Sequence, residues 1–279
     1  MDTSIAVLGN GVWGKKLNAL FQSWGFKVSQ YGARSFLELN FERQQKILDN
    51  DVVWIASTPD LQLRIISDVS RYQKKSILIL EKPFFRDLNE QIKFVEIMNN
   101  SDLYLRSSSP WVYSDIWSKS KKKLLELLNP LEIIISRSGP SNNKSIRPYM
   151  DWLSHDVQLM ADLFSSETKV IHVNRSTDKS QSDSCKIHIR LNDGSNLDLS
   201  GGLSVSKISY WKVQDKRGHF IEIDFNSKLL QCFGSNQVLI ESYKSPLDDN
   251  PLLNMLLNYT DQSNDKKVES FFRWQEVLI

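Results

Sequence analysis

The feature that most constrains this sequence is a glycine-rich turn near its start. Gly9-Asn10-Gly11-Val12-Trp13-Gly14 matches the pattern G-x-G-x-x-G, for which a chain with 11 glycines in 279 residues gives roughly 0.02 random matches. The turn follows the apolar run 4–8, typical of a buried parallel strand, and precedes apolar residues at helical spacing in 17–24. Such a turn binds a pyrophosphate at the start of the helix. It therefore predicts a dinucleotide site, the alternative being a tight turn without a ligand.

The first third of the sequence alternates short apolar runs with segments of helical spacing. The runs predict strands at 27–31, 51–57, 76–80 and 103–105, and the helical segments lie at 61–72 and from a capping Asp87 to about Asn100. Repeated strand–helix units of this length are typical of a parallel, doubly wound sheet. We therefore expect a Rossmann dinucleotide-binding domain over residues 1–109.

The remainder of the sequence has a different pattern. After a helix expected around 113–128, side chains alternate with a period of two in strands expected at 186–191, 208–213, 219–225 and 229–233. This alternation predicts a mostly antiparallel sheet with one open face. The expected fold class is thus α/β, with the Rossmann domain followed by an α+β domain for substrate binding and oligomerisation over residues 110–279.

Composition excludes several classes of function. With 35 Lys and Arg against 33 Asp and Glu, the net charge of +2 gives no electrostatic reason to expect nucleic acid or an anionic membrane as partner. No apolar stretch has the length of a membrane span, and no secretion signal precedes residue 4. Cys185 and Cys232 form neither a metal-binding nor a disulfide pattern, so no metal is expected. We expect a cytoplasmic protein with a small-molecule substrate.

The end of the second expected strand bears on the choice of cofactor. A site for NAD normally has an acidic residue there, which binds the ribose 2′-hydroxyl. Here the segment is Tyr31-Gly-Ala-Arg34-Ser35, without an acid. Arg34 can pair with a 2′-phosphate and Ser35 can donate to it. The segment favours NADP(H) over NAD(H), unless Arg34 is simply an exposed loop residue.

Two further segments carry candidate catalytic side chains. Glu81-Lys82-Pro83 directly follows an expected parallel strand, where ligands of open α/β sheets bind. On a helix expected to start at Trp152 with Asp151 as its N-cap, Asp151, His155 and Asp162 share one polar arc. A carboxylate beside a histidine orients it and stabilises its protonated form, which suits proton transfer. The alternative is an Asp–His pair on a solvated helix face.

The ordered set of these motifs resembles the Gfo/Idh/MocA family of NAD(P)-dependent oxidoreductases. The resemblance rests on the glycine turn, Glu81-Lys82-Pro83 and Asp151-x-x-x-His155, with Thr58-Pro59 after a strand, and it covers about the first 165 residues. It implies that Lys82 polarises a substrate hydroxyl or carbonyl, that His155 is the general acid/base, and that Asp151 orients it. It further implies a cis Lys82–Pro83 bond, as in some relatives. Leu153 stands where the family usually has glycine.

The resemblance also implies a cofactor site and an assembly. The cofactor-binding set comprises Gly9, Asn10, Gly11, Val12, Trp13, Gly14, Arg34, Ser35, Ser57, Thr58, Pro59, Glu81 and Lys82. The sheet of the second domain is expected to form a homodimer or homotetramer.

The expected activity is hydride transfer between the nicotinamide of NADP(H) and a carbonyl or alcohol carbon of a sugar, sugar nucleotide or cyclitol. An imine or bilin reductase of the same family is an alternative, which a pocket lined by Trp111, Tyr113 and Trp117 would favour. A non-catalytic cofactor-binding regulator is the third possibility.

Overall fold

The fold of the chain was analysed in a computed structural model, which describes residues 2–72, 76–140, 146–177, 183–260 and 274–279. The described residues form two compact units. The first comprises those up to Ser108 together with 256–260 and Ile279, and the second comprises Ser109–Met255 and 274–278. We propose that residues 1–109 form the dinucleotide-binding domain and residues 110–279 the domain for substrate binding and oligomerisation.

The first unit contains a five-stranded parallel sheet with the strand order β2-β1-β3-β4-β5. Its strands are β1 (Ser4–Leu8), β2 (Lys27–Tyr31), β3 (Val52–Ile55), β4 (Ile77–Leu80) and β5 (Leu105–Ser107). Every side chain of the central strands β3 and β4 is buried, which explains why these strands are continuous apolar runs rather than alternating ones.

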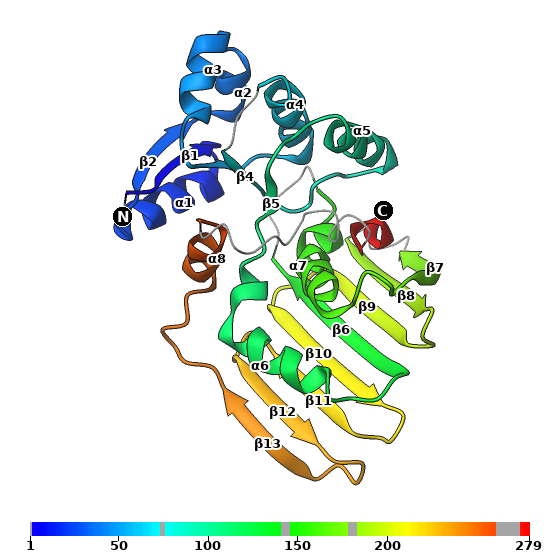
Figure 1. Cartoon of the computed structure of the whole chain (residues 1–279). Coiled ribbons are helices and arrows are strands. Elements are labelled where there is room, and N and C mark those ends of the chain that lie inside the picture. The colour runs from blue at the N-terminus through cyan, green and yellow to red at the C-terminus, as the bar shows by residue number, and fades with distance from the viewer. Residues whose placement is uncertain (1, 73–75, 141–145, 178–182, 261–273) are drawn as a thin grey trace. The chain divides into compact units, whose positions relative to one another are not determined.

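Helices cover both faces of this sheet. They are α1 (Val12–Ser23), α2 (Ala33–Leu37), α3 (Phe41–Leu48), α4 (Pro59–Val69) and α5 (Leu88–Asn99). Because crossovers between parallel strands are right-handed, α1 lies on one face and α4 and α5 on the other (Figure 1). The side chain of Asn40 caps the N-terminus of α3, and the side chain of Asp87 caps the N-terminus of α5. The cap at Asp87 agrees with the expectation from the sequence.

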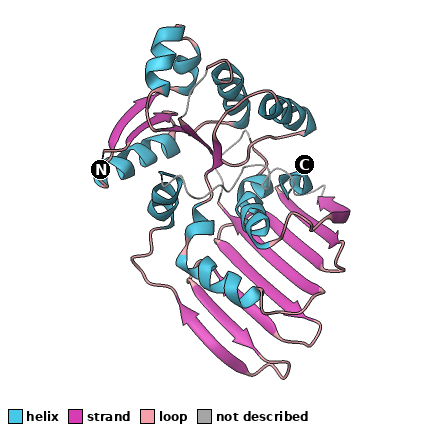
Figure 2. Cartoon of the chain, in the orientation of Figure 1, coloured by secondary structure: helices cyan, strands magenta, loops and turns pink. Residues whose placement is uncertain are grey.

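The second unit contains an eight-stranded sheet with the order β13-β12-β11-β10-β6-β9-β8-β7. Figure 2 shows its strands in magenta. Its strands are β6 (Leu131–Gly139), β7 (Val170–Thr177), β8 (Ser184–Leu191), β9 (Asn196–Leu203), β10 (Ile208–Asp215), β11 (Phe220–Asp224), β12 (Leu229–Phe233) and β13 (Leu239–Lys244). Only β6 and β9 pair in parallel; the other neighbours among these strands are antiparallel. The expected fold class is therefore confirmed.

Helices pack on one face of this second sheet (Figure 1). The helical segments that contain residues of the second unit are η1 (Pro110–Tyr113), α6 (Asp115–Leu124), α7 (Pro148–Leu163), α8 (Pro251–Thr260) and η2 (Glu276–Leu278). Under α7, the strands alternate between side chains buried against the helix, such as Ile133 and Ile187, and exposed ones on the opposite face, such as Ile134 and Lys186.

The start of α7 differs from the sequence prediction. The helix begins at Pro148, not at Trp152, and Arg147 is its N-cap residue, so Asp151 lies inside the first turn instead of capping it. Proline is well suited to the first position of a helix because its φ is already helical and it has no N–H to satisfy there. The prediction overlooked this proline. The last strand of the first sheet was also misplaced, because it runs from Leu105 to Ser107 and not over 103–105.

Glycines in the second sheet make room for bulky residues on α7. A Cβ added to Gly201 would lie 2.5 Å from Leu153 Cγ, and one added to Gly139 would lie 2.4 Å from Trp152 Cζ2. Leu153 is fully buried, and the Trp152 indole donates a hydrogen bond to the Gly139 carbonyl over 3.1 Å. Leu153 is thus accommodated by the absence of a side chain on the strand at Gly201.

Candidate active site

Strand register brings several predicted site residues to one edge of the first sheet. Leu8 of β1 is paired with Tyr31 of β2 and with Ile55 of β3, and Ile55 is paired with Leu80 of β4. These strands therefore end at the same level. The residues that follow them, namely Gly9, Gly32, Ala56 and Glu81, meet at the carboxyl edge of the sheet, where open α/β folds bind their ligands.

The glycine turn is packed tightly at its first and third glycines and open at its second. A Cβ on Gly9 would lie 2.0 Å from the Ala56 carbonyl oxygen, and a Cβ on Gly14 would lie 2.2 Å from that of Gly9. The Gly9 N–H donates to the Tyr31 carbonyl over 2.8 Å. A Cβ on Gly11, in contrast, would meet no atom of the described residues within 4 Å. This is the division of roles that the dinucleotide motif requires.

Polar groups near the turn are suited to a phosphate-bearing ligand. Gly11 is the N-cap residue of α1 and provides no side chain to bond the N–H groups of the first helical turn. Those groups are the ones that a helix start offers to an anion. The Oγ atom of Ser57, just beyond β3, is buried and has no hydrogen-bond partner among the residues that the structure describes. The edge thus has an open backbone cradle and a buried hydroxyl, both of which fit a dinucleotide.

The residues expected to select the cofactor lie beside this turn. Arg34 and Ser35 are exposed and lie on the short helix α2, so Arg34 is not a loop residue. A Cβ built on Gly32 would lie 3.1 Å from Ser35 Oγ and 3.4 Å from Asn10 Nδ2. The end of β2 and the glycine turn are therefore neighbours, as a site that binds both a ribose and a pyrophosphate requires.

Glu81 has internal partners that sequence reasoning missed. Its buried Oε1 accepts hydrogen bonds from the indole N–H of Trp13, at 2.7 Å, and of Trp54, at 2.8 Å. Burial raises the pKa of the Glu81 carboxyl. The hydrogen bonds from both indoles and from Ser108, together with the positive charge of Lys82, favour the carboxylate and offset part of this rise. Glu81 and Trp13, both predicted to bind the cofactor, thus bind each other.

Lys82 and the Thr58-Pro59 pair lie at the same edge. Lys82 is half-buried, and its bond to Pro83 is cis. Thr58 is the N-cap residue of α4, whose first residue is Pro59. From this helix Gln62 Nε2 donates to the Glu81 carbonyl over 2.8 Å. The first unit therefore gathers the whole predicted set around the glycine turn except Asp151 and His155, which belong to the second unit.

In the second unit, Asp151 and His155 lie one helical turn apart on α7, and both are half-buried. The next residue, Asp156, is fully buried. It accepts from Arg137 Nε over 2.6 Å and from Trp211 Nε1 over 2.7 Å. The segment of α7 that carries His155 is therefore fixed to the sheet by two charge-assisted hydrogen bonds.

Asp162, which shares the polar arc with Asp151 and His155, has a separate set of contacts. Its Oδ2 accepts from Trp117 Nε1 and from Lys121 Nζ, both over 2.9 Å. It therefore links α7 to α6. The basic run near the end of α6 also has partners, since Lys123 pairs with Glu241 over 2.9 Å and Lys119 lies over the Tyr243 ring.

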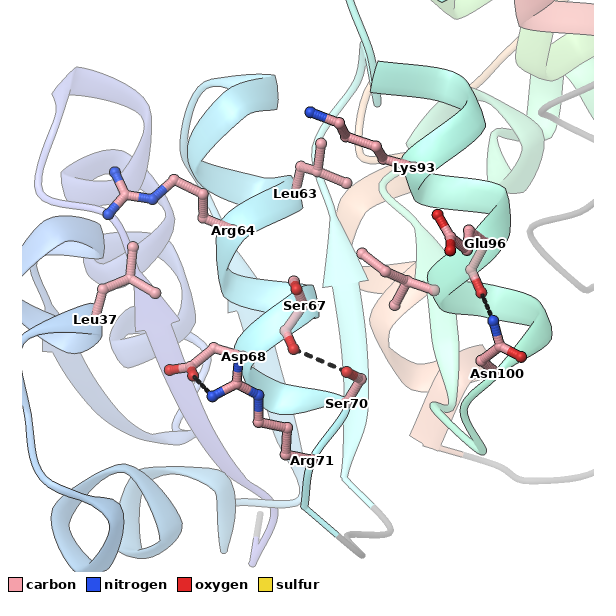
Figure 3. A pocket seen from close by; sticks show the side chains of 11 residues that line it. Leu37, Leu63, Arg64, Ser67, Asp68, Ser70, Arg71, Lys93, Glu96 and Asn100 are labelled. Atoms are coloured by element: carbon pink, nitrogen blue, oxygen red, sulfur yellow. Dashed lines mark hydrogen bonds and ion pairs between the residues drawn. The ribbon is translucent and has the colours of Figure 1, made fainter. Parts of the chain in front are cut away.

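One groove of the first unit lies apart from these residues. It has a volume of about 730 Å³ and runs between α2, α4 and α5, lined by residues such as Leu63, Arg64, Asp68 and Lys93 (Figure 3). It contains none of the predicted site residues. Among the described parts of the chain, no cluster of His, Cys, Asp and Glu is arranged to hold a metal ion. No helix that the structure describes combines the length and apolarity of a bilayer span.

Comparisons with known proteins give matches at the level of structure. No family model and no curated protein matches the sequence. Three solved structures illustrate the match. UDP-N-acetylglucosamine 3-dehydrogenase from Acidithiobacillus ferrooxidans is 14% identical with a TM-score of 0.75, covering 100% of this chain and 96% of that one. Aldose–aldose oxidoreductase from Caulobacter crescentus is 13% identical with a TM-score of 0.74 and coverage of 100% and 96%. Biliverdin reductase from Synechocystis, solved with biliverdin and NADP+, is 12% identical with a TM-score of 0.72 and coverage of 99% and 96%.

These neighbours are dehydrogenases and oxidoreductases of the Gfo/Idh/MocA type. The chain has their fold over its whole length. The fold that the motif resemblance implied is thereby confirmed.

Proposed function

We propose that this protein is an NAD(P)-dependent oxidoreductase acting on a carbonyl or alcohol carbon of a sugar, sugar nucleotide or cyclitol. The observation that carries the proposal is the glycine turn, which is closed by packing at Gly9 and Gly14 and open at Gly11. The buried Ser57 hydroxyl and the motifs at Lys82 and His155 support it. The fold shared with known dehydrogenases agrees with it.

The roles of the side chains follow from their chemistry. When bound, the nicotinamide cofactor supplies or accepts the hydride. The Lys82 ammonium donates a hydrogen bond to the substrate oxygen and polarises the carbonyl during reduction. His155 gives that oxygen its proton, or removes it in the reverse direction, and Asp151 orients the imidazole. N–H groups at the start of α1 hold the pyrophosphate.

The preference for NADP(H) over NAD(H) is part of this proposal. Arg34 and Ser35 are exposed beside the glycine turn, and the end of β2 provides no acid to bind a free ribose 2′-hydroxyl. Replacing Arg34 by Ala should weaken NADPH binding about tenfold and leave NADH binding nearly unchanged. Calorimetric titration with both nucleotides measures this, and equal effects on the two would contradict the assignment.

The proposed cofactor site is tested by Gly11→Ala. Because the added methyl would meet no atom of the described residues within 4 Å, the variant should fold like the wild type, whereas the methyl would obstruct the pyrophosphate. We expect affinity for NADPH to fall about tenfold or more, measured by calorimetry, with an unchanged urea-unfolding midpoint. Wild-type affinity in the variant would contradict the site.

The catalytic roles are tested by Lys82→Ala and His155→Ala. Each should lower kcat about tenfold or more while cofactor affinity changes little. Lys27→Ala and His172→Ala are matched controls, since Lys27 is on the edge strand β2 and His172 is exposed on the edge strand β7 of the second sheet. Wild-type rates in both test variants would show that the roles are wrong.

Reduction of an imine or a bilin is the alternative activity, favoured by the structural likeness to biliverdin reductase. The aromatic pocket expected for it is not supported at Trp117, which is fully buried in contact with Trp211 and donates to Asp162. Assaying NADPH oxidation with ketosugars, imines and bilins distinguishes the two activities. Cofactor binding without turnover of any of them would favour a non-catalytic regulator.

Self-association through the open face of the second sheet is also proposed. This face carries exposed apolar residues, including Ile134 and Ile208, among polar ones such as Lys186. A homodimer or homotetramer would cover them. Light scattering coupled to size exclusion tests this, with Ile134→Asp expected to lower the mass of the assembly.

A further inference from the structure

We propose that Trp13 and Glu81 form a positioning clamp that joins the phosphate-binding turn to the residue beside Lys82. The inference rests on the proposed function and adds two positioning residues to it. Its physical basis is the hydrogen bond of 2.7 Å between Trp13 Nε1 and Glu81 Oε1.

The clamp has one partly exposed side and one fully buried side. Trp13 lies in the first turn of α1, directly after the glycine turn, and its side chain is 38% exposed. Trp54, on the central strand β3, is fully buried and donates to the same Glu81 oxygen over 2.8 Å. Glu81 is thus anchored to the core by Trp54, and it in turn holds the partly exposed Trp13.

The backbone of Glu81 is fixed as well. Gln62 Nε2 donates to its carbonyl over 2.8 Å, and the carbonyl of Leu80, just before it, accepts from the Ser108 N–H over 2.7 Å. Both the side chain and the main chain of the residue preceding Lys82 are therefore held by neighbouring elements. The backbone from which the Lys82 side chain extends is consequently held in place.

A purely structural explanation does not account for the charge. A neutral side chain would satisfy the two indole N–H groups without the cost of burying a carboxylate. Here burial raises the pKa of the Glu81 carboxyl even though the positive charge of Lys82 opposes this, and this buried acid directly precedes Lys82. The bond to Trp13 extends this arrangement to the turn that holds the cofactor phosphates. We infer that it keeps the Lys82 ammonium aligned with the nicotinamide, where a misplacement of about 1 Å can reduce the rate about a hundredfold.

Three variants separate the elements of the clamp. Trp13→Phe removes the N–H and keeps an aromatic ring. Glu81→Leu removes the acceptor, whereas Glu81→Gln keeps an oxygen that can accept from both indoles. Trp24→Phe is the matched control, because Trp24 lies at the other end of α1 and its indole makes no hydrogen bond within the described residues.

Kinetics and hydrogen exchange together test the clamp. We expect Trp13→Phe and Glu81→Leu to lower kcat about tenfold with the KM for NADPH within about threefold of wild type, and Glu81→Gln to restore about fivefold over Glu81→Leu. In the protein without cofactor, amide hydrogen exchange should accelerate in peptides covering 9–16 and 80–86 in Trp13→Phe and not in Trp24→Phe.

The outcomes distinguish failure of the clamp from failure of the proposed function. If Trp13→Phe matches Trp24→Phe in both exchange and kcat, or if Glu81→Gln is as impaired as Glu81→Leu, the clamp is refuted. If the wild type binds neither NADPH nor NADH, the proposed function fails, while the exchange experiment still reports whether the bond couples the two segments.

Discussion

Arg137 and Asp156 form an ion pair that is almost completely shielded from solvent, with side-chain exposures of 1% and 0%. The Arg137 Nε donates to Asp156 Oδ2 over 2.6 Å, while Trp211 Nε1 donates to Asp156 Oδ1 over 2.7 Å. The guanidinium also lies 5.3 Å from the centre of the Phe225 ring. This pair joins β6 to α7 at the residue that follows His155.

Replacing Arg137 by Met leaves the Asp156 carboxylate buried without its cation. We expect the free energy of unfolding to fall by about 3–5 kcal/mol, as is typical when one partner of a buried pair is removed. Urea unfolding measures the effect, and the double variant Arg137→Met/Asp156→Leu should recover part of it. Arg190→Met on the open face of β8 is the control, since Arg190 is exposed. A similar small loss in Arg137→Met and Arg190→Met would contradict this interpretation.

Gly14→Ala should destabilise the first unit although alanine favours helices. In an exposed helix, this exchange stabilises by about 1 kcal/mol. Here the new Cβ would lie 2.2 Å from the Gly9 carbonyl oxygen, so α1 must shift away from the turn. We expect a net loss of about 1–3 kcal/mol by chemical denaturation. Gly11→Ala, whose methyl would meet no atom within 4 Å in the described part of the chain, provides the comparison, and equal stability of the two variants would refute the packing argument.

The Glu81 carboxyl makes stability depend on pH in one direction. Burial raises its pKa above the ordinary value of 4.5, so the folded state binds the proton more tightly than the unfolded state does. Stability from this group is complete below pH 4.5 and is lost as pH rises through the folded pKa. Glu81→Gln does not titrate. Its stability relative to wild type should therefore increase from about pH 4 to about pH 8, measured by urea unfolding in a series of buffers. A constant difference would contradict the raised pKa.

Asp215 should show the opposite dependence. It is buried, which opposes ionisation, but hydrogen bonds from Arg217, the Leu128 N–H and the His219 N–H outweigh this and lower its pKa below 3.8. Its stabilising effect is therefore present above pH 3.8 and lost as pH falls through the folded pKa. Asp215→Asn should cost about 1–3 kcal/mol near neutral pH, and less in acid. Asp193→Asn, in another turn of the same sheet, tests whether the acid dependence is specific to Asp215.

The local patterns of the sequence predicted the first sheet more completely than the second. The glycine turn lies where its motif indicates, between β1 and α1. Close packing requires glycine at positions 9 and 14, so the local sequence is enough to predict the turn. The short helices α2 and α3 were missed, as were β6 and β9 at the centre of the second sheet. Alternation reveals a strand but not its partner, and the parallel pairing of β6 with β9 joins segments far apart in the chain.

The sequence predicted which residues belong to the candidate site, but it did not predict the contacts that these residues make. Motif spacing identified Glu81 and Trp13 separately, but the hydrogen bond between them joins the first turn of α1 to the residue that follows β4. Likewise, nothing in the sequence around Asp156 indicates that Arg137 is its partner. The position of Asp151 was misjudged for a local reason, since the proline at 148 that begins α7 was not considered as its first residue.

The contact between Leu153 and Gly201 has a consequence for how this scaffold can vary. Leu153 fills the volume that a side chain at position 201 would need, so positions 153 and 201 cannot both carry a large side chain. A methyl group introduced at 201 is tolerated only if 153 becomes smaller at the same time. Homologous chains should accordingly exchange bulk between helix and strand in a compensating manner, and a library that randomises both positions together should yield folded variants that neither single change permits.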